Sequence, residues 1–280
     1  MTVSDDSAAQ KTCSLCQRDL EGTSSERMPA LSLFFRTLVG THPGTSPLHV
    51  PQPDGTTSIT NLEGSLAQLQ VPNICHGCQW DFEVNVERPS RPVLDRIVCG
   101  PTYHLAPYDF ESLARWALAT TLLTISAEPQ NICANTRQVL QAMIDDPSVP
   151  ESTALYGFGM REGHVAPVLS RSIVQTDLET GHCDVLAAVL MVGLPHLTLV
   201  SLYGSTKDWL EQSIEHVGAA AVGLPHTQLW PPITPTTIPI APSLTLQDAA
   251  AFFGAAYPAP PEAIGTRQAG TEGADSADGL

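Results

Sequence analysis

Two pairs of cysteines, each with two residues between its members, constrain this chain more than any other feature. The first pair is Cys13 and Cys16 in CSLC, and the second is Cys75 and Cys78 in CHGC, with the 58 residues 17–74 between the pairs. Each pair can present two thiolates from a tight turn. Four soft thiolates arranged tetrahedrally form the usual structural zinc site, which leaves no position open for a substrate. We therefore predict one structural Zn²⁺, bound where the two turns meet.

A redox role is the alternative for the two cysteine pairs. Thioredoxin-like use of C-x-x-C places the pair between a strand and a helix of a βαβ unit, and neither pair lies in such a setting. His76 could replace one metal ligand, but four cysteines already complete the shell, so we interpret it as a turn residue. Cys99, Cys133 and Cys183 are isolated along the sequence, and we interpret them as small hydrophobic residues without a functional role.

The composition is that of a globular protein with one or two domains, since 280 residues with 42% hydrophobic content can bury a substantial core. The net charge is −16 and no segment is basic, which argues against a protein that coats nucleic acid. Seven cysteines are too few for a secreted disulfide scaffold, and MTVSDDSAAQKT does not read as a signal peptide, so we expect a cytoplasmic protein. The long uncharged run 185–206 contains Gly and Pro, and it fits two buried strands joined at GLPH better than a membrane span.

Hydrophobic periodicity predicts helices in the first half of the chain and mainly strands after residue 152. The predicted helices are Met28–Gly40, Asp109–Glu128, Thr136–Asp145 and Asp208–His216, the last stopped by Gly218. Residues 41–58 are rich in Pro, Gly, Ser and Thr and predict an exposed loop. The strand patterns are TALYGFGM (153–160), HVAPVLSRSIVQTDL (164–178), CDVLAAVLMVGL (183–194) and HLTLVSLYG (196–204). In HTQLWPPITPTTIPIAP (226–242) the prolines favour an edge or irregular strand.

The predicted fold class is therefore α+β, with a zinc-knuckle module, a helical middle and a C-terminal half of mainly antiparallel strands. We predict four segments along the chain. Residues 1–11 form a flexible tail, 12–130 the zinc-knuckle module with its core helix, 131–264 a β-rich C-terminal domain, and 265–280 an acidic tail. The two tails are polar and rich in small residues, so they cannot bury enough apolar surface to order themselves.

The surroundings of the cysteine pairs resemble bacterial HNH-endonuclease-like proteins with a four-cysteine zinc knuckle. The segments that carry the resemblance are CSLCQRDLEGTSSERMPALSLFF (13–35) and ICHGCQWDFEVNVERPSRPVLDRIVCGPTYHLAPYDFESLARWALATTLL (74–123). It extends over most of residues 13–250 and is strongest over 75–129. The resemblance implies an HNH or ββα-metal-like fold for the first module, with all four cysteines at the zinc positions. It also implies that Glu26 stands at the family's acidic position and Glu87 at its downstream glutamate.

The chain departs from this family at the catalytic positions. The family's catalytic histidine corresponds to Arg27, and its Asn-Asn-Gly-Trp stretch corresponds to Gln79–Phe82, QWDF. An HNH nuclease needs a neutral imidazole to deprotonate water and a divalent cation to stabilise the leaving oxygen. Arginine cannot be that base, because its pKa lies above about 12. The resemblance thus implies a nuclease-like frame without the standard general base.

Acidic side chains after the second pair form another candidate constellation. If residues 79–87 are helical, Glu83 and Glu87 lie on one face and, with Asp81 nearby, could bind Mg²⁺ through oxygens. The alternative is a solvated acidic face beside Arg88 and Arg91.

Three functions are compatible with these observations. In the first, the protein is a degenerate nuclease that acts as a zinc-stabilised binding module for nucleic acid or a protein partner, with Arg27, Arg88 and Arg91 contacting phosphates. In the second, it is an active HNH-type endonuclease that uses a non-standard base, such as His42, His49 or His76, together with Mg²⁺ or another divalent cation. In the third, it is an unrelated zinc-stabilised interaction protein. Only the second function makes the chain an enzyme.

Overall fold

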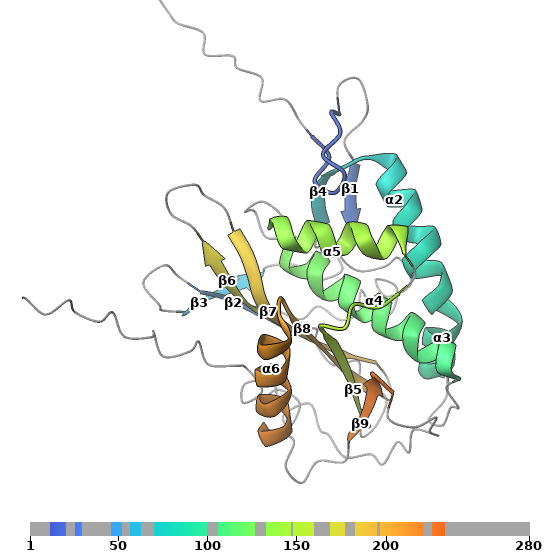
Figure 1. Cartoon of the computed structure of the whole chain (residues 1–280), viewed down its shortest axis with the longest axis vertical. Coiled ribbons are helices and arrows are strands. Elements are labelled where there is room, and N and C mark those ends of the chain that lie inside the picture. The colour runs from blue at the N-terminus through green and yellow to red at the C-terminus, as the bar shows by residue number, and fades with distance from the viewer. Residues whose placement is uncertain are drawn as a thin grey trace, which may run out of the picture.

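A computed structural model describes residues 12–20, 26–29, 46–51, 57–62, 70–99, 106–126, 133–146, 148–159, 169–176, 183–194, 197–220 and 226–232. Over these residues the fold is α+β, as predicted. Helices pack around a long central helix, α4, which lies against a five-stranded antiparallel sheet (Figure 1). The predicted tails, 1–11 and 265–280, lie outside the described residues.

The five-stranded sheet has the order β6-β7-β8-β5-β9, with every neighbouring pair antiparallel. Its strands are β5 (Thr153–Gly159), β6 (Leu169–Thr176), β7 (Cys183–Gly193), β8 (Leu197–Gly204) and β9 (His226–Trp230). Each falls within one of the five predicted strand patterns, and the run 185–206 does hold two antiparallel strands, β7 and β8. β9 is an edge strand, and Pro231 follows its last residue, where no ladder hydrogen bond is lost.

The central strands of this sheet are covered on both faces. Every residue of β5 and β8 is buried, although side chains alternate between the two faces of a strand. Leu197 and Leu199 pack in the cluster around α4 (Pro107–Ser126), and Ser201 Oγ is 3.0 Å from Thr121 Oγ1 of that helix. On the opposite face, α6 (Lys207–Ala220) packs against β8 and β7. This double cover explains why both strands are mainly apolar and why their few polar residues, such as Thr198 and Ser201, are buried as well.

Helix α4 is buried all round from Leu113 to Thr124, as expected of a helix that is hydrophobic on all sides. It begins two residues before the predicted start, because Pro107 suits the first helical position. Asp109 instead stabilises the first turn from within, since its carboxylate accepts a hydrogen bond from the Ala106 N–H at 2.7 Å and pairs with Arg96. The hydroxyls of Thr120, Thr121, Thr124 and Ser126 donate to carbonyls one turn earlier, which satisfies them inside the core.

A second helical segment runs without interruption from residue 76 to residue 99. It consists of α2 (His76–Phe82), the π-helical turn η2 (Glu83–Glu87) and α3 (Arg88–Cys99). Helix α5 (Ala134–Asp145) contains all of the predicted helix 136–145. Helix α6 continues past Gly218, so the predicted stop there is wrong. Buried Val217 holds the last turn on the sheet, and packing outweighs the weak helix propensity of one glycine.

Four short strands form two small sheets in the N-terminal part of the chain. β1 (Glu26–Pro29) pairs with β4 (Gln70–Ile74), and β2 (Ser46–Pro51) pairs with β3 (Thr57–Leu62), both antiparallel. The helix predicted to begin at Met28 is therefore wrong for its first two residues, and 30–40 lies outside the described residues. The predicted loop is wrong over 46–51 and 57–58. Pro47 and Pro51 are tolerated there because both strands of a two-stranded sheet are edges.

One hydrophobic cluster joins the two predicted domains. It contains Leu20, Val71 and Leu122 from the first predicted domain together with Leu140 and Val185 from the second. The boundary at residue 130 stays a prediction, although a shared core crosses it. Of the helices described, none combines the length and apolar character needed to cross a bilayer.

Candidate metal centre

The two cysteine turns meet. The four sulfur atoms of Cys13, Cys16, Cys75 and Cys78 all lie within 4.8 Å of one another. The Cys13 and Cys78 sulfurs are 3.9 Å apart, and those of Cys16 and Cys75 are 3.8 Å apart. The predicted meeting of two segments far apart in sequence is confirmed, and the cluster could hold a metal ion such as zinc.

The first turn, residues 12–20, is closed by backbone hydrogen bonds. The Cys13 N–H donates to the Arg18 carbonyl at 2.8 Å, and the Gln17 N–H donates to the Cys13 carbonyl at 2.9 Å. Gln17 has φ 59°, in the left-handed region, which lets the chain reverse directly after Cys16. An antiparallel bridge between Thr12 and Asp19 closes the loop. Both sulfurs of the pair are thus presented from one compact turn.

The second turn leads from β4 into α2. Cys75 caps the helix, and its sulfur accepts a hydrogen bond from the Cys78 N–H at 3.4 Å. The two turns are also bonded directly to each other, because the Ser14 N–H donates to the Asn73 carbonyl at 2.8 Å and the Cys75 N–H donates to Cys13 Sγ at 3.3 Å. Backbone N–H groups therefore face the sulfurs, an environment that favours thiolates.

The four thiols differ in burial and in acidity. Cys13 and Cys78 are 0% and 7% exposed, whereas Cys16 and Cys75 are partly exposed. The hydrogen bond shared with Cys78, supported by backbone N–H groups, lowers the pKa of Cys13 to about 4 against the opposing effect of burial. The same bond to Cys13, together with burial, raises the pKa of Cys78. The Cys13–Cys78 pair thus favours one thiolate between its two sulfurs, and a bound cation would stabilise a second.

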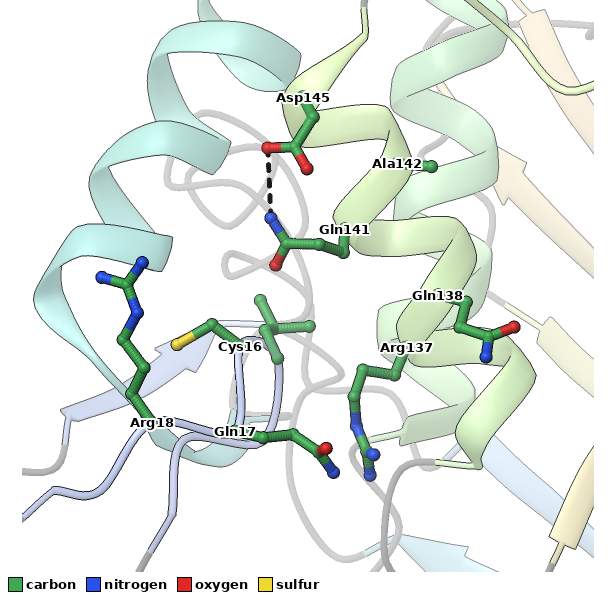
Figure 2. A pocket seen from close by; sticks show the side chains of 9 residues that line it. Cys16, Gln17, Arg18, Arg137, Gln138, Gln141, Ala142 and Asp145 are labelled. Atoms are coloured by element: carbon green, nitrogen blue, oxygen red, sulfur yellow. Dashed lines mark hydrogen bonds between the residues drawn. The ribbon is translucent and has the colours of Figure 1, made fainter.

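Helix α5 supports the first turn from the side. Arg137 donates from Nε to the Ser14 carbonyl at 3.0 Å. Between this helix and the turn lies a pocket of about 540 Å³, in which the Cys16 sulfur is visible (Figure 2). The residues that line it are Leu15, Cys16, Gln17, Arg18, Arg137, Gln138, Gln141, Ala142 and Asp145. This contact could not be predicted from sequence, since Arg137 belongs to no motif and lies 123 residues from Ser14.

A disulfide lies close to the cysteine cluster. Cys133 and Cys183 are bonded, with their Cα atoms 5.1 Å apart, and they join the start of α5 to the start of β7. The side chain of Asn135 adds hydrogen bonds to both the carbonyl and the N–H of Val185. The interpretation of these two cysteines as isolated is therefore wrong, because the fold brings together positions 50 residues apart. The side chain of Cys99 lies outside the described part of the chain.

The motif-equivalent positions lie on three elements. Glu26 and Arg27 belong to β1, and Glu26 is the partner of Ile74, the residue before Cys75. Gln79 follows Cys78 on α2, and its buried Oε1 has no hydrogen-bond partner among the described residues. Glu87 ends η2, nine residues past Cys78, or roughly 13 Å along the helix at about 1.5 Å per residue. The backbones of Glu26 and Gln79 thus adjoin the cysteine turns, whereas Glu87 lies farther along the helix.

Residues 79–87 are helical, as the hypothesis of an acidic face that binds Mg²⁺ required. Glu83 forms an ion pair with Arg88 at 3.6 Å, and the Arg88 guanidinium carbon lies 5.7 Å from the ring centroid of the exposed Trp80. Burial, followed by repulsion from Glu83, raises the pKa of Glu87 to about 7, against the attraction of Arg91. Arg88, predicted to contact phosphate, is therefore engaged by a carboxylate and an aromatic ring.

Replacing Glu87 by Gln is expected to stabilise the protein at pH 8 and to have a smaller effect at pH 5.5. The carboxyl has pKa about 7 when folded and 4.5 as its reference value, so the folded state holds its proton more tightly. The free energy of unfolding consequently falls as pH rises from 4.5 through about 7. Gln has no carboxyl to ionise, so the variant avoids this fall, which amounts to about 1–3 kcal/mol. Urea unfolding at both pH values measures the difference. The exposed Glu151→Gln serves as control, and equal changes at both pH values would contradict the assignment.

Comparison of the chain with protein-family models, with curated proteins and with solved structures found no match in any of the three.

Proposed function

We propose that this protein is a zinc-stabilised module of the HNH-nuclease type that has lost the general base and acts by binding nucleic acid or a protein partner. The observation that carries the proposal is the meeting of two C-x-x-C turns, 58 residues apart in sequence, with all four sulfurs within 4.8 Å.

The cysteine cluster has the dimensions of a zinc site. A Zn–S bond of about 2.3 Å implies a tetrahedron whose sulfur atoms are about 3.8 Å apart. Two of the sulfur pairs, Cys13 with Cys78 and Cys16 with Cys75, are separated by 3.9 Å and 3.8 Å. Four cysteines form a soft and closed donor set, so the metal would hold the fold together and would not bind substrate.

The elements around the cluster support the HNH-like part of the proposal. Strands β1 and β4 form an antiparallel pair, and β4 leads directly into α2, whose first turn carries the second cysteine pair. This order of two strands and a helix is what a ββα-metal-like arrangement requires. Arg27 occupies β1 at the position of the family's histidine, and a guanidinium cannot accept the proton of an attacking water. Binding without cleavage therefore fits this chain best.

Metal analysis of the purified protein tests the first part of the proposal. We expect one zinc per chain and no iron, because four thiolates at these separations match zinc. Elemental analysis by plasma mass spectrometry, calibrated against protein concentration, gives the ratio. A zinc content near zero in protein purified without chelator would end the proposal.

An active nuclease is the second candidate, favoured by the carboxyl of Glu87. Its pKa of about 7 suits a general base at neutral pH and could replace the missing histidine. Incubation with plasmid DNA and Mg²⁺ or Mn²⁺ separates the two functions. The proposed binding module leaves the plasmid intact, whereas cleavage that disappears in Glu87→Gln and persists in Glu151→Gln would establish the nuclease.

Replacing Arg27 by His examines whether the remaining site is assembled. If the frame around β1 and α2 is that of an HNH module, an imidazole on β1 supplies the missing base and cleavage of plasmid DNA is gained. The matched variant Arg27→Gln removes the charge without supplying a base and is expected to stay inactive. Intact plasmid with both variants, under conditions in which both retain zinc, would count against the HNH-type frame.

A further inference from the structure

We propose that Cys16 is an oxidation site, at which the Cys16 thiolate reacts with hydrogen peroxide that enters the pocket beside α5 and then becomes linked to Cys75. The inference rests on the metal centre of the proposed function, but it is independent of nucleic-acid binding. It assigns different roles to four cysteines that the sequence pattern treats as equivalent.

The four sulfurs differ in how they can be reached. Cys13 and Cys78 are buried in the hydrophobic cluster, at 0% and 7% exposure. Cys16 and Cys75 are partly exposed, and of the four only Cys16 lines the pocket. A small oxidant in solution therefore meets the sulfur of Cys16 first.

The pocket wall offers polar groups that suit a peroxide. The Oε1 atom of Gln141 is buried and has no hydrogen-bond partner among the described residues, while its Nε2 donates to Asp145 at 3.2 Å. Figure 2 shows this oxygen on the side of the pocket that faces Cys16 and the Arg18 guanidinium. Hydrogen peroxide both donates and accepts hydrogen bonds, so it can donate to Gln141 and accept from Arg18 while it lies beside the sulfur.

The chemistry then follows the spacing of the sulfurs. The Cys16 thiolate attacks one peroxide oxygen, the O–O bond breaks, and a sulfenic acid and hydroxide form. The Cys75 thiolate, whose sulfur lies 3.8 Å away, attacks the oxidised sulfur, so that an S–S bond forms and a second hydroxide leaves. Each hydroxide takes a proton from solvent. Two thiolates thus lose two electrons in total, and one peroxide becomes two waters.

Loss of these two ligands would affect the rest of the fold. Only Cys13 and Cys78 would remain as thiolate ligands, too few to retain zinc in a four-coordinate site. The first turn is bonded to α5 through Arg137 and Ser14, and the cysteines belong to the same hydrophobic cluster as α4 and α5. Peroxide would therefore release zinc and loosen the contact between the first turn and the helices.

The order of oxidation is the first test. Zinc-loaded full-length protein is treated with increasing hydrogen peroxide, and zinc release is followed with a chromogenic chelator. Free thiols are alkylated at each time, and disulfides are mapped by mass spectrometry. We expect loss of free Cys16 and Cys75, and a peptide linked through these two residues, to accompany zinc release. A first-formed link between Cys13 and Cys16, between Cys75 and Cys78, or between Cys13 and Cys78 would overturn the proposal.

The pocket itself is tested by a pair of variants on one helix. Gln141→Leu removes the acceptor but keeps a side chain of similar size, and it should slow peroxide-driven zinc release about three- to tenfold, as expected for loss of one hydrogen bond. Gln138→Leu is the control, because Gln138 lines the same pocket but its side chain is exposed and projects from the side of α5 away from Cys16 (Figure 2). Equal rates for both variants and the unmodified protein would show that the pocket plays no part.

The test separates this inference from the proposed function. Protein that purifies without zinc contradicts the proposed function whatever its thiols do. Protein that carries zinc but loses it with no preference among the four cysteines contradicts only the inference. The zinc content decides the first case and the mass of the linked peptides decides the second, and neither needs an assay of nucleic acid.

Discussion

Replacing Cys75 by Ser is expected to abolish stoichiometric zinc binding and to lower the free energy of unfolding by at least about 3 kcal/mol. Cys75 contacts all three other cysteines of the cluster. Its sulfur lies 3.8 Å from the Cys16 sulfur and accepts a hydrogen bond from the Cys78 N–H, and its own N–H donates to Cys13 Sγ. The cysteine cluster belongs to the hydrophobic core, so loss of the metal is expected to weaken the packing of α4 and α5 as well. Urea unfolding and metal analysis of the same preparation measure both effects.

Cys183→Ser is the matched control for this experiment. Like Cys75→Ser, it replaces one partly buried sulfur by oxygen. It breaks the disulfide to Cys133, however, and leaves the four clustered cysteines unchanged. We expect it to lower stability while the zinc content stays at one per chain. If Cys75→Ser unfolds at the same urea concentration as the parent protein, the cluster does not stabilise the fold and the structural role of the metal is wrong.

The sequence predicted the large sheet well because its signals are local. β5, β7 and β8 are mainly apolar runs that include several β-branched or aromatic residues and are bounded by turn residues, and such runs fit strands that are buried on both faces. The core helix α4 was equally clear, since twenty residues with helical spacing between two prolines leave few alternatives. In these elements, local propensity and tertiary burial favour the same structure.

Predictions failed where distant segments decide the local structure. Met28 and Pro29 were predicted to be helical because of the apolar spacing that follows them, yet pairing with β4, more than 40 residues later, makes them a strand. β2 and β3 were hidden by their prolines, which usually indicate a loop. The disulfide between Cys133 and Cys183 has no spacing signature at all. Local pattern cannot report such long-range pairings.

The candidate metal centre likewise has a part that the local sequence pattern predicts and a part that depends on distant segments. The four cysteines were predictable because metal ligation imposes a spacing of two residues within each pair, and the structure brings all four together. The support from Arg137 and the difference in access between Cys16 and Cys13 were not predictable, since both depend on where α5 packs. Sequence thus identified which residues could bind metal, and the fold determines which of them solvent can reach.

Replacing Gly204 by Ala is expected to destabilise the protein by at least about 3 kcal/mol, or to prevent folding. Gly204 is the last residue of β8, and the first turn of α6 crosses the strand at this point. A Cβ atom at this position would overlap with the backbone nitrogen of Leu210 and would lie 2.8 Å from the Thr206 carbonyl oxygen. Backbone atoms cannot move aside as a flexible side chain can. Buried Leu210 and Val217 also hold α6 on the sheet, so the helix cannot shift without exposing apolar surface.

Gly218→Ala provides the opposite expectation within the same helix. No atom lies within 4 Å of a Cβ placed on Gly218, and the residue is inside α6. Alanine there should stabilise the protein by about 0.5–1 kcal/mol, because it favours the helix and restricts the unfolded chain. Urea unfolding of both variants is therefore expected to shift in opposite directions. If Gly204→Ala were tolerated as well as Gly218→Ala, α6 would not cross the end of β8, and the cover over the second face of the sheet would have to be assigned to other residues.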